Sequence, residues 1–408
     1  MAKKIYDEII GSIQETDDDI RFRWGERYEY FVRTVKGKAY PIVCRVPVKS
    51  EGTKAVADKE EVVLDMNEVA KTLKYCSLGS FRLSPSHDVL AYSIDPNGYE
   101  TYEVRFKDLK TGVHLPDVIK GTAGGVSWGA GDAEVYYSTQ DDAHRSDKVW
   151  RHAMGTPQSS DVCVLKEDDE LFSVGFGRTS SGKYMLLETE STETNEVRVV
   201  PLSQPKGEPL LMQPRRLGHR YYPEHRGEHW YILTNRNERI NFDLVVAPVN
   251  APEEANWVPI VTASGASGAF AWSEGRTLES IAAFENFLVL EGREGGFSAL
   301  WVLQLHESTA AITSWHKTSW PSENCCVYTA VASSSLGCVG ANQEFCAEEI
   351  FVTYMSLTTP KTVYRYNMRT QDKTVIKVTP VNGFNAEKVG LTMNLLFPYF
   401  MGISVSLN

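Results

Sequence analysis

Three short motifs in the sequence have residue types and spacing that could perform chemistry. Residues 125–129 have the pattern G-x-S-x-G, in which a strained turn between a strand and a helix exposes a nucleophilic serine, here Ser127. Residues 225–229 have the pattern H-x-x-E-H, which places two zinc-binding histidines on one face of a helix. Residues 177–183 have the glycine and lysine spacing of a phosphate-binding loop. Each kind of site depends on a helix beside its motif.

The segments after two of these motifs predict strands. A short turn and then Val135, Tyr136 and Tyr137 follow the Ser127 motif, and aromatic and β-branched residues favour strands. The phosphate-loop motif has Tyr184 where a Ser or Thr would hold magnesium, and a strand-like segment follows it. We therefore expect Ser127 to lie in a strand that enters a hairpin, and residues 177–183 to form a hairpin turn.

The histidine motif also lacks a helical context. Pro223 and Gly227 disfavour a helix, and the strand-like residues 230–233 follow directly. We expect His225 and His229 to be solvated histidines near a turn. No pair of cysteines and no cluster of Cys and His has zinc-ligand spacing. Together with the contexts of the three motifs, this means that the sequence predicts no catalytic residue, no metal site and no cofactor.

Charge sets further limits on the binding partners. The formal net charge of −11 excludes an extended surface for nucleic acid or anionic membrane, which would need clustered Lys and Arg, and it favours a basic ligand. The acidic run at residues 167–170 could meet a cation, but such runs more often form solvated loops.

The compartment follows from the cysteines and the N-terminus. Seven cysteines are an odd number, and free thiols in a reducing compartment explain them most simply. Tyr6, Asp7 and Glu8 stand where a signal peptide would have an apolar run. We expect a cytoplasmic protein.

Most of the chain has the pattern of short strands separated by turns. Ile9, Ile10 and Ile13 predict one short helix over residues 6–14, and strand-like segments in pairs follow it. The first members of the pairs are residues 28–34, 89–93, 134–138, 183–187, 230–233, 287–290 and 350–354. The second members are residues 40–46, 99–106, 148–152, 196–202, 242–247, 300–305 and 363–366.

The seven pairs recur at spacings of about 45 to 60 residues, which suits propeller blades of four strands each. A β-sandwich is the alternative, but a single sandwich rarely has 408 residues, and no linker divides the chain. The sequence therefore predicts an all-β protein, a seven-bladed β-propeller with a short N-terminal helix. A closed ring provides a central channel more readily than an active site.

Several long strings then identify a family. The sequence resembles the propeller of the prolyl oligopeptidase family of serine peptidases, and within it the oligopeptidase B group, over roughly residues 6–388. The strings are RYEYFVRTVKGKAYPIVCR (27–45), FRLSPSHDVLAYSIDPNGYETYEVRFKDLKTG (81–112), DDAHRSDKVWRHAMG (141–155), FSVGFGRTSSGKY (172–184) and SLTTPKTVYRYNM (356–368).

The resemblance implies a domain plan. Residues 1–16 are expected to form a helical segment and residues 17–388 the propeller. In the family a catalytic α/β-hydrolase domain carries the Ser, Asp and His of catalysis and would begin just after Lys388. Residues 389–408 instead form an apolar tail that diverges from the family. They include Pro398 and Gly402, which disfavour a membrane span. No family catalytic residue has a matching position, so we expect the catalytic domain to be absent.

One residue of the propeller is a candidate for contact with substrate. Residues 98–100 resemble a Gly-x-acid turn of the family, whose carboxylate faces the cavity between the domains and pairs with an arginine of the hydrolase domain. The resemblance assigns this position to Glu100. The alternative is a solvent-exposed glutamate in a turn.

The implied function is that of a substrate gate. The family propeller limits access to short peptides, and oligopeptidase B cleaves after Arg or Lys, which suits the acidic charge. We expect the chain to be inactive alone and to bind short basic peptides or a hydrolase domain supplied in trans. The alternative is a non-catalytic propeller scaffold that binds peptides or proteins.

Overall fold

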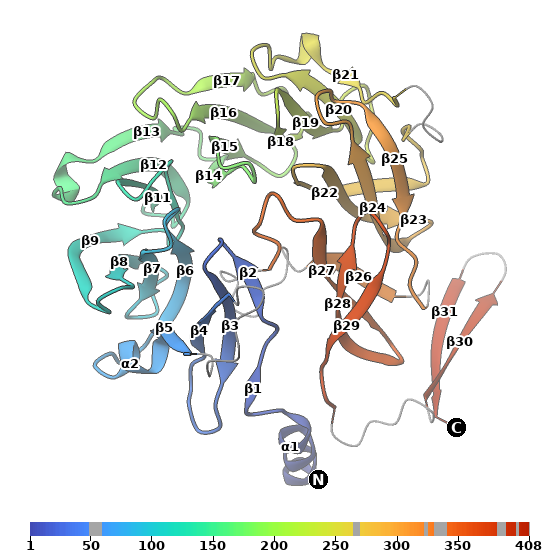
Figure 1. Cartoon of the computed structure of the whole chain (residues 1–408), viewed down its shortest axis with the longest axis horizontal. Helices are drawn as coiled ribbons and strands as arrows, with labels where there is room; N and C mark the ends of the chain where they lie inside the picture. Colours follow the sequence, from blue (N-terminus) through green and yellow to red (C-terminus); the bar gives the residue numbers. More distant parts are fainter. Residues whose placement is uncertain are drawn as a thin grey trace.

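A ring of β-sheets makes up most of the molecule (Figure 1). The computed structural model describes residues 1–48, 59–263, 270–321, 325–329, 341–381, 389–396 and 400–407. Six four-stranded sheets and one five-stranded sheet follow one another around the ring as blades 1 to 7 in chain order. The predicted all-β fold with seven propeller blades is therefore confirmed.

Each blade is built from one continuous stretch of chain whose strands pair with their neighbours in sequence, except that in blade 1 the first two short strands both pair with the third. The first strands of the blades are β1 (Asp17–Asp18) with β2 (Phe22–Trp24), β6 (Ser77–Leu83), β10 (Val126–Trp128), β14 (Ser173–Arg178), β18 (Tyr221–Arg226), β22 (Arg276–Ala283) and β26 (Cys325–Thr329). The second strands are β3 (Tyr28–Thr34), β7 (Val89–Asp95), β11 (Glu134–Gln140), β15 (Tyr184–Glu190), β19 (His229–Thr234), β23 (Phe287–Glu294) and β27 (Glu349–Ser356).

The outer half of each blade completes the sheet. The third strands are β4 (Ile42–Pro47), β8 (Tyr102–Asp108), β12 (Ser146–Ala153), β16 (Asn195–Pro201), β20 (Asp243–Pro248), β24 (Phe297–Leu305) and β28 (Thr359–Asn367). The fourth strands are β5 (Glu61–Asp65), β9 (His114–Thr122), β13 (Val162–Lys166), β17 (Leu210–Gln213), β21 (Val258–Pro259), β25 (Ile312–Lys317) and β29 (Lys373–Val378). The pairs predicted from the sequence are the second and third strands.

Apolar layers between neighbouring blades hold the ring together. On β15, Met185 and Leu187 pack with side chains of blade 3, whereas Leu186 packs with side chains of blade 5. Successive side chains of a strand point to opposite faces of a sheet, so a strand covered on both faces is apolar at successive positions. The core is therefore a series of layers around the ring rather than one central cluster.

The turns between first and second strands repeat one hydrogen bond. In blades 2, 3 and 4 the first turn residue donates its N–H to the carbonyl five positions later: Ser84 to Val89 (2.8 Å), Gly129 to Glu134 (3.0 Å) and Thr179 to Tyr184 (3.0 Å). The fourth position has a positive φ in two of them, 59° at His87 and 69° at Gly182. The turns of these three blades are therefore closed in the same way.

The N-terminal helix begins earlier than the sequence predicted. Helix α1 is Ala2–Ser12, and Ile13 is already extended. Because the helix starts four residues before the predicted residue 6, Asp7 and Glu8 lie in its middle and its first turn contains no acidic residue. β1 starts pairing with β3 at Asp17, which limits how far the helix can extend. A second helix, α2 (Met66–Ala70), connects blades 1 and 2.

Blade 1 and blade 7 are each made from their own segment of the chain, so they share no strand. Side-chain contacts close the ring between them instead. The Lys377 ammonium of β29 bonds to the Asp17 carboxylate and the Asp18 carbonyl. The Gly25 N–H donates to the Glu344 carboxylate. Beyond the ring, β30 (Val389–Leu396) and β31 (Phe400–Leu407) pair with each other as an antiparallel hairpin.

Helices are few in this fold. Within the described ranges none is both long and apolar enough to cross a lipid bilayer.

Candidate functional site

A cavity of about 830 Å³ lies in the middle of the ring. Strands β6, β10, β14 and β22 contribute to its wall, with Trp24 of β2 and residues 342–345 before β27. Serines and threonines supply many of its polar groups, and its ionisable lining residues are Arg82, His87, Arg178 and Glu344. Pockets for small ligands are roughly 300–1,000 Å³, so this cavity can hold a small polar ligand.

Ser127 lies on this wall but not at a nucleophile turn. It is the middle residue of β10, paired with Tyr136 of β11, and a hairpin follows, as the sequence predicted. The neighbouring Trp128 is fixed by a 3.0 Å hydrogen bond from its Nε1 to the carbonyl of Arg82 in blade 2. Among the described residues no histidine bonds to Ser127, so the base that a nucleophilic serine requires is not beside it.

The predicted environment of His225 was wrong. His225 lies within β18, is 1% exposed, and bonds through Nδ1 to the Ser181 hydroxyl at 2.7 Å. Burial lowers the pKa of His225 to about 4. The sequence suggested a turn because of Pro223, but β18 pairs on one side only, and an edge strand tolerates a proline.

His229 lies at the start of β19, opposite Arg226 across the hairpin, so the two histidines of the motif occupy separate strands. In the described part of the chain no three side chains of the metal-binding types come together.

The phosphate-loop motif is a hairpin turn, as predicted. β14 ends at Arg178 and β15 begins at Tyr184, with the turn between them closed by the bond from Thr179 to Tyr184. No helix follows, so the turn lacks the helix N-terminus that binds phosphate in such loops.

The acidic run meets cations in the structure. Glu167 is 7% exposed and pairs with Arg215 of the loop before β18 at 2.7 Å. Arg145 donates to the carbonyls of Glu167, Asp169 and Phe172. Asp168 and Glu170 are exposed, as expected of a solvated loop, and Asp168 pairs with the nearby Lys166. Glu167 and the backbone of Asp169 therefore fix the connection between blades 3 and 4.

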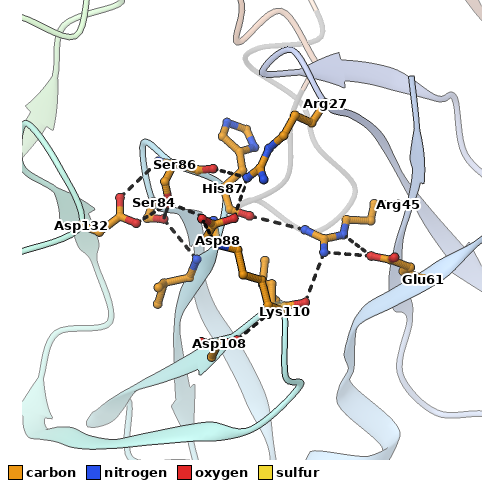
Figure 2. A network of polar contacts seen from close by, with 12 residues as sticks. Arg27, Arg45, Glu61, Ser84, Ser86, His87, Asp88, Asp108, Lys110 and Asp132 are labelled. Atoms are coloured by element: carbon orange, nitrogen blue, oxygen red, sulfur yellow. Dashed lines mark hydrogen bonds and ion pairs between the residues drawn. The ribbon is translucent and has the colours of Figure 1, made fainter. Parts of the chain in front are cut away.

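A polar network that the sequence did not predict holds the blade 2 turn at the cavity (Figure 2). Arg27 of blade 1 donates to the Asp88 carboxylate at 2.6 Å and to the Ser86 carbonyl. Lys110 reaches the other oxygen of Asp88 at 2.7 Å. On the opposite side the Ser86 hydroxyl and N–H donate to Asp132 of blade 3. Three successive blades thus fix one turn.

Arg45 supports the same turn from below the surface. It is 4% exposed, pairs with Glu61 at 2.8 Å, and places its guanidinium 3.9 Å from the centre of the Tyr28 ring. It also donates to the His87 carbonyl at 3.4 Å. Burial, together with Arg27 and Arg45, lowers the pKa of His87 to about 4. His87 therefore lines the cavity as a neutral ring near pH 7, within 3.2 Å of the Tyr30 hydroxyl.

A similar link fixes the blade 4 turn. The N–H and hydroxyl of Ser180 donate to the two carboxylate oxygens of Glu224 in blade 5, at 3.1 and 3.2 Å. The His225 N–H donates to the same carboxylate at 2.8 Å. Burial is the dominant effect and raises the pKa of Glu224 to about 7, although these hydrogen bonds oppose it.

This raised pKa predicts a pH-dependent stability. Between the ordinary Glu pKa of 4.5 and the folded value of about 7 the folded state binds more protons, so stability falls as pH rises through this window. The neutral E224Q variant is expected to be about 1–2 kcal/mol more stable than the wild type at pH 8, with a much smaller difference near pH 5. Urea unfolding at both pH values measures this. An equal effect at pH 5 and pH 8, or the same gain in a control E208Q at an exposed site, would contradict it.

Glu100 lies in the turn between β7 and β8, at the other end of β7 from the turn at residues 84–88. It is exposed and has a φ of 55°. Its N–H donates to Asp95, as do those of Asn97 and Gly98. Burial alone would raise the pKa of Asp95, but these N–H donors hold it below its ordinary value. The turn is thus well fixed, and contact between Glu100 and another domain stays a prediction.

The arginines of the cavity wall were the main residues that sequence reasoning missed. Arg82 lies on β6, and Arg178 stands inside the phosphate-loop motif. The first strands of a propeller line its central axis, so a charged residue on a first strand could have indicated a charged side chain at the central cavity.

The comparisons with known proteins agree with this geometry. Residues 1–379 match the family model described as prolyl oligopeptidase, N-terminal beta-propeller domain. Dipeptidyl aminopeptidase BI of Pseudoxanthomonas mexicana is 29% identical over 399 residues, which are 95% of this chain and 51% of that protein. Protease 2 of Moraxella lacunata is 29% identical over 384 residues, 94% of this chain and 51% of that protein.

Solved structures give the same result. Oligopeptidase B from Leishmania major superposes with a TM-score of 0.84 at 30% identity, over 96% of this chain and 53% of that one. Oligopeptidase B from Trypanosoma brucei, with covalently bound antipain, gives 0.85 at 29% identity, over 99% and 54%. The chain therefore spans about half the length of the relatives that it matches.

Proposed function

Because the chain belongs to the prolyl oligopeptidase N-terminal β-propeller family, we propose that it is the substrate-gating propeller of an oligopeptidase B-like serine peptidase that cleaves short peptides after Arg or Lys. The observation that carries this proposal is the cavity of about 830 Å³ enclosed by the ring. It can hold a few residues of an extended peptide, whereas a folded protein is too large to enter.

The partner in this proposal is a hydrolase domain, with the propeller inactive alone. Helix α1 supports such docking, because its apolar side chains face solvent: Ile5, Tyr6 and Ile9 are 50%, 64% and 57% exposed. Exposed apolar side chains that gather in one patch are typical of interaction sites. The apolar face of α1 is therefore the proposed contact surface.

We also propose that the protein is located in a reducing compartment, the cytoplasm. Cys44, Cys76, Cys163 and Cys346 are free thiols, which supports a cytoplasmic location.

Complementation in trans tests the proposal. The 408-residue chain is mixed with the half of Leishmania major oligopeptidase B that it does not cover, and hydrolysis of a dibasic fluorogenic peptide is followed. We expect no turnover by the chain alone and turnover by the mixture. Turnover by the chain alone, or labelling of Ser127 by a serine-reactive phosphonate, would overturn the proposal. Binding of peptides without any association with the hydrolase half would instead support the scaffold alternative.

The helix surface gives a second expected result. I9D places a charge on the exposed apolar face of α1, and it is expected to weaken association with the hydrolase half about tenfold or more, because the charge loses water on docking. D7A on the same helix is the matched control and should associate like the wild type. Analytical ultracentrifugation or interferometry measures both. Equal affinity of I9D and D7A would remove α1 from the contact surface.

A further inference from the structure

The geometry points to a binding site for a carboxylate in the central cavity: we propose that Arg178, with Arg82 on the same wall, binds a carboxylate group of a short peptide. This goes beyond the proposed function, because the site belongs to the cavity whether or not a hydrolase domain docks. Two cationic side chains would repel a ligand that carries only positive charge, so they indicate a ligand with an anionic group.

The turn of blade 4 holds Arg178 in place. Arg178 is the last residue of β14, and its Nε donates to the Gly182 carbonyl at 3.3 Å. A Cβ at Gly182 would lie 2.5 Å from Nη2 of Arg178, so only a glycine lets the guanidinium approach the turn this closely. The φ of 69° at Gly182 favours glycine for a second, independent reason. The guanidinium is thus positioned by the backbone rather than by an ion pair.

No carboxylate among the described residues neutralises this guanidinium. Within the described ranges Arg178 has no salt bridge, whereas Arg27, Arg33 and Arg215 each pair with an acidic side chain. Surrounding protein atoms lower the pKa of Arg178 by desolvation, the one effect that acts on it. The Arg178 side chain is nevertheless exposed at the cavity wall, so an anion in the cavity can reach its guanidinium.

The rest of the cavity wall is also suited to an anion. Arg82 adds a second guanidinium, and the one carboxylate among the described lining residues, Glu344, already accepts the Gly25 N–H. The hydroxyl of Ser127 on the same wall can donate a hydrogen bond. The wall is therefore cationic although the whole chain has a net charge of −11.

Planar carboxylates match the guanidinium fork, since two parallel N–H bonds reach both oxygens. The volume of about 830 Å³ exceeds what a bare carboxylate fills and leaves room for two or three peptide residues. We therefore assign the site to the C-terminal carboxylate or an acidic side chain of a short peptide.

Calorimetric titration of the full chain tests this assignment. The probes are the peptide Ala-Ala-Glu with a free C-terminus, the uncharged acetyl-Ala-Ala-Gln-amide, and sodium sulfate. The acidic peptide is expected to bind at least tenfold more tightly than the amide and sulfate, and its affinity should fall as NaCl is raised. R178Q is expected to lose about tenfold to hundredfold in affinity. R178K, which keeps the charge but not the fork, should lie between them.

The control is R293Q, which removes an exposed arginine of blade 6 that pairs with Glu279 at the surface. It should bind like the wild type, and thermal melting verifies that R178Q and R178K are folded. Wild-type affinity in folded R178Q would overturn the proposal, as would equal binding of acidic peptide and amide. Sulfate binding with the affinity of the peptide would overturn the peptide assignment. None of these results depends on complementation by a hydrolase domain, so the two proposals can fail separately.

Discussion

Replacement of Asp161 by alanine is expected to lower the free energy of unfolding by about 3–5 kcal/mol. The Asp161 side chain is 1% exposed and bonds to His152 Nδ1 at 2.7 Å. It also accepts a 2.8 Å hydrogen bond from the Tyr137 hydroxyl. D161A would remove the partner of the His152 Nδ1 and the carboxylate that accepts from the Tyr137 hydroxyl, and a buried polar atom that loses its hydrogen bond costs more than the bond itself contributed.

Urea unfolding of D161A measures this loss, with D168A as the matched control. Asp168 is an acidic residue of the same blade, but its side chain is 80% exposed and pairs with Lys166 at the surface. D168A should stay within about 0.5 kcal/mol of the wild type. A D161A protein as stable as D168A would show that the buried cluster does not support blade 3.

The second large effect is expected from G292A, at about 3 kcal/mol of destabilisation or more. A Cβ on Gly292 of β23 would lie 1.9 Å from the carbonyl oxygen of Thr277 on β22. The pairing of these strands shifts register between Leu278 and Ser280, and the added methyl group would meet backbone that no rotamer change can move. The strands would have to separate at this irregularity.

G175A is the control, because Gly175 also lies within a strand but has its nearest contact, the Glu188 Cβ, at 4.0 Å. G175A should be neutral or stabilise slightly, since alanine restricts the unfolded chain. Thermal unfolding of both variants under one set of conditions measures the difference. Similar losses for G292A and G175A would mean that the glycine effect is general for strands rather than specific to the register shift.

The sequence predicted the second and third strands of each blade and missed most of the first and fourth strands. Residues 230–233 of β19 are all buried, so their apolar run is easily recognised. β29 is almost entirely exposed, and β13 is mostly so. Outer strands of this kind form because the third strand offers them a backbone edge, and such pairing leaves no apolar periodicity in the sequence.

The candidate site was predicted less well, because its properties arise between blades. The turn around Thr179 was recognised as a turn, but its partner Glu224 lies on the next blade, as does Asp132, the partner of the blade 2 turn. Arg178 was visible only as part of a motif whose chemistry did not apply. Whether a carboxylate reaches it depends on the folded ring, which local sequence patterns cannot reveal.

The contiguity of the blades also bears on how the protein is synthesised. Every blade pairs only strands that are close in sequence, so each sheet can form as soon as its own stretch of chain leaves the ribosome. The seam differs, because Lys377 meets Asp17 only after nearly all of the propeller has been made. Until then the exposed flank of blade 1 has no neighbour, and a nascent chain is most vulnerable to aggregation at that edge.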